Sequence, residues 1–349
     1  AVSDNFKKRF ESYGWNYLSI DGHNEKEIFR ALKKVKLSKK PTVISCKTKI
    51  GYGSPNKSGK ASSHGSPLGE DEVSLVRKKL NWKYKKFEIP NNILNQWRII
   101  GNKGEKFESN WNKIYKRKKR NINKILNINF NKSIKSEKIN ALKELKAIAS
   151  RKSSELVLNE LTKNKNMLIG GSADLAGSNN TKTKYQEIVK PNDFSGNYIH
   201  YGVREHAMCG IMNGLALHSK FIPYGGTFLI FSDYCKPSIR LSAMMAQRVI
   251  YVMTHDSIGL GEDGPTHQPI EQLSGLRAIP NLNVLRPADR TETIECWEIA
   301  LRSSTTPSIL SLTRQNLNPI RKKYSKVNKC NFGAYEILRT NNKIKLTIL

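Results

Sequence analysis

The amino-acid sequence predicts an α/β protein with a mostly parallel sheet that is covered by helices on both faces. Apolar and amphipathic segments alternate through residues 148–318 at the pace of repeated strand–helix units. The strands are continuous apolar runs, such as RVIYVM at 248–253, which is typical of strands buried on both faces. Polar, glycine-rich segments follow several of these runs. Open α/β sheets bind ligands beyond the carboxyl ends of their strands, so the same pattern also predicts where a site should lie.

The first 92 residues read as the end of one α/β domain. Residues 25–34 have the spacing of an amphipathic helix, and Pro41 introduces the strand TVISCK. A glycine-rich loop follows at 51–69. Residues 93–145 then turn polar and rich in Lys and Asn, which predicts a helical linker between two domains.

A second α/β domain is expected at 146–318. Its predicted elements are a helix at 153–161, strands at 167–176 and 197–202, a helix at 204–218, an apolar segment at 221–231, a helix through 244–245, and strands at 248–253, 282–287 and 307–312. The helix at 204–218 carries a stripe with the spacing of a buried face: Met208, Ile211, Met212 and Leu215. Asp289 and Glu292 resemble a capping box before the last strand. Residues 319–349 read as the start of a further domain that includes KIKLTIL at 343–349.

Composition excludes several classes of protein. With 38% hydrophobic and 26% charged residues, the chain is globular, and it contains no apolar run of the roughly 18 residues that a membrane span needs. The net charge of +31 suggests nucleic acid, but the lysines are scattered and accompany no nucleic-acid-binding motif, so no such partner is expected. Five widely spaced cysteines indicate neither a disulfide framework nor a metal site and fit a reducing, cytoplasmic compartment.

The segment from Thr254 to Pro269, THDSIGLGEDGPTHQP, is the strongest candidate for a site. It places His255, His267, Glu262 and Asp263 in a loop whose glycines and prolines forbid a long helix or strand. A turn with solvated histidines is the alternative. The literal GxGxxG within it is not a dinucleotide motif, because two carboxylates fill the loop and would repel a pyrophosphate. Residues 54–60 likewise lack the leading glycine of a P-loop.

Other candidates are weaker alone. Glu205 stands in the first turn of an apolar helix, where it either complements the helix dipole or exchanges a proton with a ligand. Phe228, Phe231 and Tyr234 either belong to the core or wall a pocket for a flat ring. Four further residues at loop edges offer the cation and hydroxyl donors that a phosphorylated substrate needs: His64, Arg151, Ser178 and Arg314.

Taken together, six ordered segments resemble signatures of the transketolase family, the thiamine-diphosphate-dependent enzymes of the pentose phosphate and Calvin pathways. The segment at 46–69 is similar to the end of the family's diphosphate-binding domain. The other five resemble its pyrimidine-binding domain: 170–179, 197–208, 225–234, 254–269 and 312–317. The resemblance implies a thiamine-diphosphate-binding fold, complete in its pyrimidine-binding domain and partial in its diphosphate-binding domain. It implies reversible transfer of a two-carbon ketol unit from a ketose phosphate to an aldose phosphate.

The resemblance also assigns cofactor residues. Glu205 would hydrogen-bond a ring nitrogen of the aminopyrimidine and promote the tautomer that deprotonates the thiazolium carbon. The other side chains expected near the cofactor are Phe228 and Phe231 on the pyrimidine, Tyr234 and Asp174 beside it, and His64 at the diphosphate.

Substrate residues follow in the same way. Asp263 would contact a substrate hydroxyl, and His267 would lie over the reacting carbon and assist proton transfer. With Glu205 and His64, His267 completes the expected catalytic set, and His64 also approaches the substrate. The sugar phosphate is expected to contact His255, Arg151, Ser178 and Arg314.

The chain also departs from the family pattern. It has no counterpart of the family's upstream GDG and Asn motif, so the Mg²⁺ ligands are expected outside it and none within it. The chain is therefore expected to be a fragment that lacks activity alone, from an enzyme whose site forms between the subunits of a homodimer. Three alternatives remain: a dihydroxyacetone synthase, a 1-deoxyxylulose-5-phosphate synthase, and a truncated non-catalytic homologue.

Overall fold

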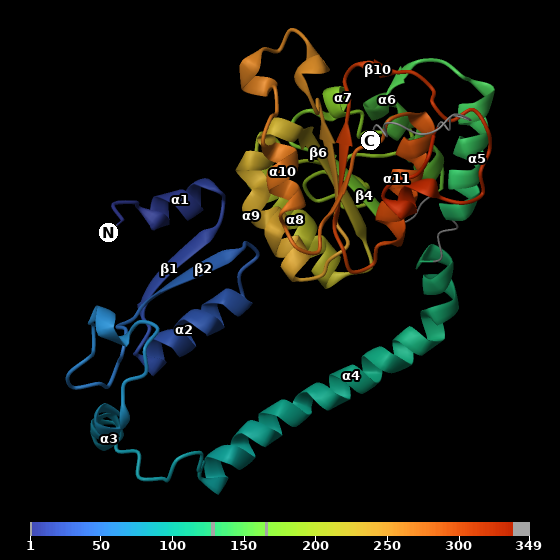
Figure 1. The fold of residues 1–349 in the computed structure, drawn as a ribbon. Coiled ribbons are helices and arrows are strands. Elements are labelled where there is room, and N and C mark those ends of the chain that lie inside the picture. The colour runs from blue at the N-terminus through green and yellow to red at the C-terminus, as the bar shows by residue number, and fades with distance from the viewer. Residues whose placement is uncertain (1, 127–129, 165–166, 338–349) are drawn as a thin grey trace. The chain divides into compact units, whose positions relative to one another are not determined.

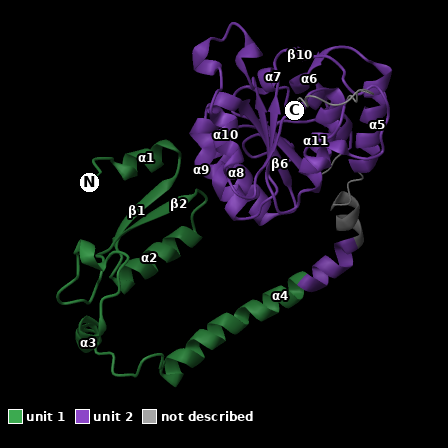
Figure 2. Ribbon diagram, in the orientation of Figure 1, with its two compact units in different colours: residues 1–111 green, residues 112–349 purple. Residues whose placement is uncertain are grey.

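The computed structural model describes residues 2–126, 130–164 and 167–337, and its chain divides into two compact units, 1–111 and 112–349 (Figure 2). The helices and strands of the first unit are α1 (Phe6–Ser12), β1 (Asn16–Asp21), α2 (Glu25–Lys36), β2 (Thr42–Lys47), α3 (Glu70–Lys79) and the first part of α4 (Asn91–Leu126). β1 and β2 pair in parallel, and α2 begins at Asn24, whose side chain accepts hydrogen bonds from two backbone N–H groups. The expected helix–strand order of this region is confirmed.

The glycine-rich loop after β2 is held in place by a carboxylate. Glu72, in the first turn of α3, accepts hydrogen bonds from the Ser54 hydroxyl and from the backbone and side chain of Asn56. These hydrogen bonds, that of Ser54 foremost, lower the pKa of Glu72 to about 2. His64 follows a single 3-10 turn in the same loop and is exposed.

The second unit is built on a six-stranded parallel sheet in the order β5-β4-β6-β7-β9-β8 (Figure 1). Its strands are β4 (Leu168–Ser172), β5 (Tyr198–His200), β6 (Ile222–Phe228), β7 (Ile250–Thr254), β8 (Asn283–Leu285) and β9 (Ser308–Leu312). Its helices are α5 (Phe130–Lys143), α6 (Ser150–Thr162), α7 (Ala176–Asn179), α8 (Glu205–His218), α9 (Ser232–Met244), α10 (Gln272–Arg277) and α11 (Arg290–Arg302). The short β3 (Ile148–Ala149) and β10 (Asn316–Leu317) form a separate antiparallel pair. The predicted parallel α/β sheet is confirmed.

Alternate residues of the central strands serve two cores. Ile250 and Val252 of β7 pack with α5, α6 and α11 on one face, around the fully buried Trp297. Tyr251 and Met253 face the opposite side, where α8, α9 and α10 lie. This double burial is the reason that the strands read as continuous apolar runs.

One packing prediction was wrong. Met208 and Met212 of α8 are fully buried, but Ile211 is 47% exposed. The buried face of α8 instead includes Cys209, the residue after Met208, which packs in the core that α8 shares with α9. Periodicity located the buried side of the helix but not its centre.

A buried ionic network lies at the outer side of α11. The Glu295 carboxylate is fully buried and accepts hydrogen bonds from Lys138 of α5, at 2.9 Å, and from Arg321, at 2.6 Å. Backbone N–H groups of Lys329 and Cys330 donate to the same carboxylate. Burial raises the pKa of Glu295, but the hydrogen bonds and charges of Arg321 and Lys138 outweigh it and keep that pKa below its ordinary value. The network ties residues 321–330 to the second unit.

None of the helices in the described ranges combines the length and the apolar character required to span a bilayer. The expected strand at 343–349 lies outside the described residues.

Candidate active site at the carboxyl edge of the sheet

The predicted site residues of the second unit follow the carboxyl ends of its strands. The chain leaves β4 toward β5 on one side and leaves β6 toward β7 on the other, so the sheet has a topological switch point between β4 and β6. Ligands of open α/β sheets bind in the crevice at such a point. Asp174 and Ser178 follow β4, and Phe228 ends β6. His255 directly follows β7, and Arg314 follows β9.

Two arginines line this edge. Arg151, in the first turn of α6, donates a hydrogen bond of 2.7 Å to the backbone oxygen of Ser178. Arg314 donates to the Leu260 oxygen at 2.7 Å and forms an ion pair with Glu262 of the 254–269 loop. Burial, and after it the charge of Arg314, lowers the pKa of Arg151. Two neighbouring cations suit an anionic ligand.

The aromatic residues form a continuous stack. The Phe228 ring lies 3.7 Å from the His255 imidazole and is nearly parallel to it, and it is also parallel to Phe231 at 5.7 Å. The His267 ring stands edge-on to Phe228 and Phe231 at 5.9 and 5.4 Å. Phe228 is buried beneath His255, whereas Phe231 is half-buried and Tyr234, 5.8 Å from it, is 64% exposed. Phe231 is therefore the phenylalanine that can present a ring to a ligand.

His255 is buried and strained. Its φ of 59° lies in the left-handed region, which a non-glycine residue rarely occupies and which often marks a functional site. Burial lowers the pKa of His255 to about 4, and the positive charges of Arg151 and Arg314 act in the same direction against the opposing effect of Asp263. The imidazole is therefore neutral at pH 7.

The 254–269 loop contains no long helix or strand, as predicted, and its regular structure is two single 3-10 turns, Ile258–Leu260 and Pro265–His267. His267 is half-buried, whereas Asp263 is exposed. Thr266 and His267 share a hydrogen bond of 2.9 Å. The alternative of a turn with solvated histidines is wrong for His255, which is 2% exposed.

Glu205 and Asp174 stand apart from this cluster. Glu205 begins α8, is 8% exposed, and accepts no hydrogen bond from any residue in the described part of the chain. Asp174 is exposed and has a φ of 62°. Both lie at the same edge of the sheet, because β4 and β5 are parallel. His64 belongs to the first unit and is not brought to this edge by the second unit's fold.

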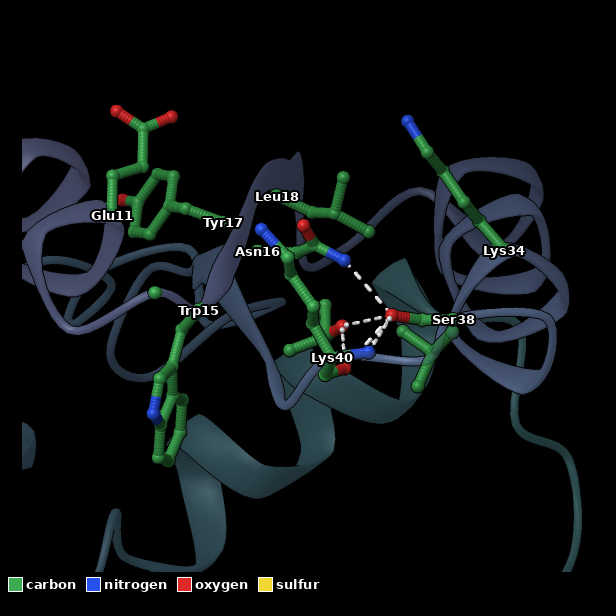
Figure 3. A pocket seen from close by; sticks show the side chains of 11 residues that line it. Glu11, Trp15, Asn16, Tyr17, Leu18, Lys34, Ser38 and Lys40 are labelled. Atoms are coloured by element: carbon green, nitrogen blue, oxygen red, sulfur yellow. Dashed lines mark hydrogen bonds between the residues drawn. The ribbon is translucent and has the colours of Figure 1, made fainter. Parts of the chain in front are cut away.

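A separate hollow lies in the first unit. It has a volume of 410 Å³ and is lined by residues of α1, β1, α2 and the start of β2 and of the loops between them, including Trp15, Tyr17 and Lys34 (Figure 3). The Ser38 hydroxyl accepts hydrogen bonds from the Asn16 side chain and the Lys40 N–H, so these polar groups are already partnered. None of the predicted site residues lines this hollow.

Comparison with known proteins decides the family. The sequence model described as "Transketolase, pyrimidine binding domain" matches residues 146–319, and that described as "Transketolase, thiamine diphosphate binding domain" matches residues 1–137. The chain belongs to the transketolase family. A transketolase from Sinorhizobium medicae is 42% identical over the whole chain, which covers 51% of that protein.

Solved transketolases share the fold. The structure from Leishmania mexicana matches 98% of the chain with a TM-score of 0.87 and 35% identity. A transketolase from Pichia stipitis in complex with sedoheptulose-7-phosphate matches 91% of the chain with a TM-score of 0.80 and 37% identity. The chain covers 52% and 50% of those two structures, so it spans about half the length of the transketolases it matches.

Several polar residues at this edge of the sheet were not among the predicted site residues. Asn179 donates a hydrogen bond to Thr254, which in turn pairs with His255. Asp256, whose side chain is fully buried, pairs with Arg286 at 2.7 Å. Asp256 stands in the predicted loop, where a carboxylate directly after a buried strand was the available signal. Asn179 lies in a predicted signature, but no spacing pattern links it to Thr254.

The pKa of His255 predicts an effect of acid on stability. Since burial holds that pKa near 4, against 6.5 in an unfolded chain, the unfolded state binds the extra proton between these values. The contribution of the neutral His255 to the free energy of unfolding is therefore fully present above pH 6.5 and is lost as the pH falls toward 4. Replacing His255 with glutamine should reduce the loss of unfolding free energy between pH 7 and pH 4.5 by up to roughly 3 kcal/mol. Urea unfolding of the second unit at both pH values measures it.

The matched control is His64→Gln, since His64 is exposed and lies in the other unit. An equal acid-induced loss in His255→Gln and the unmodified chain would contradict the assignment of this proton to His255.

Proposed function

We propose that this chain supplies the pyrimidine-binding and sugar-phosphate-binding part of a transketolase, which transfers a two-carbon ketol unit from a ketose phosphate to an aldose phosphate. The observation that carries the proposal is the pair of arginines, Arg151 and Arg314, which line the same carboxyl edge of the sheet as the buried His255. Two guanidinium groups and hydrogen-bond donors suit a phosphate ester. The binding of sedoheptulose-7-phosphate by the related Pichia stipitis protein supports the same class of ligand.

Thiamine diphosphate is the proposed cofactor, and the residues present fit its pyrimidine. Glu205 offers a nearly buried carboxylate without a protein partner in the described residues, and Phe231 offers a half-buried ring for stacking. When bound, the cofactor would supply an electron sink for the electron pair that stays on the carbonyl carbon of the ketol unit when its bond to the rest of the donor sugar breaks. Glu205 would hold a proton at the pyrimidine ring, and Tyr234 and Asp174 would border the cofactor.

The remaining residues would bind and orient the substrate. Arg151, Ser178, Arg314 and His255 would hold the phosphate end. Asp263 would accept a hydrogen bond from a sugar hydroxyl, and His267 would move a proton at the reacting end. Two arginines favour a phosphorylated acceptor over formaldehyde, the acceptor of dihydroxyacetone synthases.

The diphosphate-binding half of the site is proposed to involve His64 of the first unit and residues that this chain does not contain. His64 would approach the diphosphate and the substrate. In the described ranges, no group of three or more His, Cys, Asp or Glu side chains is placed to hold a metal ion. Mg²⁺ ligands would be supplied by a part of the protein upstream of this chain. A homodimer would bring the pyrimidine-binding part of one subunit to the diphosphate-binding part of its partner. The five free thiols fit a reducing cytoplasm.

We expect the purified 349-residue chain to have no measurable ketol-transfer activity with thiamine diphosphate and Mg²⁺, because the proposed metal ligands are elsewhere. A full-length transketolase that contains this sequence should be active under the same conditions. A coupled assay of ketol transfer between two sugar phosphates measures both. Activity in the 349-residue chain would contradict the divided site, and an inactive full-length protein would contradict the proposed function.

A further inference from the structure

A line of buried polar side chains runs from the sheet interior to His255. The Ser172 hydroxyl at the end of β4 lies 3.2 Å from the Asn179 side-chain oxygen, and the Asn179 amide donates to the Thr254 hydroxyl at 2.6 Å. The Thr254 hydroxyl lies 2.9 Å from Nδ1 of His255. Ser172, Asn179 and Thr254 are each fully buried, so this line is shielded from water.

The proton count along this line decides which nitrogen of His255 carries hydrogen. The Thr254 oxygen accepts a hydrogen bond from the Asn179 amide, and its own buried hydrogen needs an acceptor. In the described residues the next partner is Nδ1 of His255. To accept that hydrogen, Nδ1 must be unprotonated, and the neutral ring then carries its proton on Nε2.

We propose that Asn179 and Thr254 are positioning residues that hold His255 as the tautomer protonated on Nε2. In this form His255 presents a hydrogen-bond donor, and not an acceptor, to the ligand at the carboxyl edge of the sheet. Nε2 has no hydrogen-bond partner among the described residues, so it is available for this role.

The surroundings of the ring agree with a donor. Stacking on Phe228 at 3.7 Å fixes the plane of the imidazole, and the left-handed backbone at His255 fixes its point of attachment. The groups that lower the pKa of the His255 ring by their charge are Arg151, Arg314 and His267, and the group that raises it is Asp263. Two arginines attract an anionic oxygen, and a neutral Nε2–H can donate to the same oxygen without the cost of a third buried charge.

The identity of this ligand as a sugar phosphate rests on the proposed function, but the tautomer does not. The test therefore begins with the tautomer in the 349-residue chain. Long-range ¹H–¹⁵N correlation spectra of the histidine rings distinguish a protonated from an unprotonated ring nitrogen. The His255 signals are assigned by their loss in His255→Gln. At pH 7 we expect a single neutral tautomer with Nδ1 unprotonated.

Thr254→Val removes the hydroxyl with little change in volume and should release the tautomer, giving a mixture or a switch to protonated Nδ1. Thr254→Ser should preserve the original spectrum. The matched control is Thr227→Val on the neighbouring strand β6, since Thr227 is equally buried and its hydroxyl has no hydrogen-bond partner. This control should leave the His255 signals unchanged. Urea unfolding confirms that each variant is folded.

A protonated Nδ1 in the unmodified chain would overturn the proposal, because Nδ1 would then donate to Thr254 instead of accepting from it. An unchanged tautomer in folded Thr254→Val would also overturn it. Titration with inorganic phosphate is a separate readout. Thr254→Val should weaken phosphate binding by roughly 2–10-fold, the worth of one hydrogen bond. If phosphate fails to bind while the tautomer is fixed and depends on Thr254, the proposed function loses support and the positioning role stands.

Discussion

Replacement of Glu295 by alanine should lower the free energy of unfolding of the second unit by about 3–5 kcal/mol. The carboxylate is fully buried, and the side chains of Lys138 and Arg321 that it pairs with are 5% and 7% exposed. Its removal leaves the buried Arg321 without a carboxylate partner, leaves Lys138 with only the Glu298 carboxylate at 3.9 Å, and leaves two backbone N–H groups without this acceptor. The cost of that desolvation exceeds the worth of the lost ion pairs. Urea unfolding followed by circular dichroism measures the change.

Lys152→Ala is the control for this prediction. It breaks an ion pair with Glu155 on α6 of the same unit, but the lysine side chain is 52% exposed, so a loss of at most about 1 kcal/mol is expected. Equal effects of the two substitutions would mean that the Glu295 network is no stronger than a surface ion pair.

Replacing Glu205 by glutamine should lower ketol transfer roughly 10²–10⁴-fold in a full-length transketolase that contains this sequence, the usual worth of a positioned acid–base group. Glutamine has the size of glutamate and can form hydrogen bonds, but it cannot carry the charge or exchange the proton. Because Glu205 is 8% exposed and receives no hydrogen bond in the described residues, its role in stability is expected to be small. The coupled assay measures the rate.

The comparison variant is Glu187→Gln, which removes the charge of an exposed carboxylate in the same unit and should leave the rate unchanged. A Glu205→Gln enzyme with full activity would exclude Glu205 from the proton transfer.

The sequence predicted most of the second unit's elements because their signals are local. The strand at 248–253 and the helix that follows Asp289 were both recognised within about ten residues of sequence, and the Asp289 side chain accepts from the Glu292 N–H as a capping residue should. The return bond of the capping box differs, because the Glu292 carboxylate accepts from Ala288 and not from Asp289. The prediction that Ile211 is buried was wrong because periodicity in an apolar helix does not show which of its sides packs in the core.

The site was predictable only as a set of loops. Each predicted residue could be placed after a strand, but the pairs that determine its chemistry join distant parts of the chain. Asn179 and Thr254 are 75 residues apart, and Lys138 and Glu295 are 157 apart. Similarly, the stacking of Phe228 on His255 depends on the pairing of β6 with β7 and not on either segment alone. Such contacts follow from sheet order, which local patterns do not specify.

The order of the strands also affects how the protein is made. β8 precedes β9 in the chain but reaches the sheet only through it, and β7 has its second neighbour in β9. After β7 has emerged from the ribosome, the edge that later pairs with β9 therefore stays open until Leu312, the last residue of β9, has emerged as well. At about 5–20 residues per second this wait is roughly 3–12 s. During that interval the open β7 edge is a template for pairing with other chains, so protection by a chaperone would matter most there.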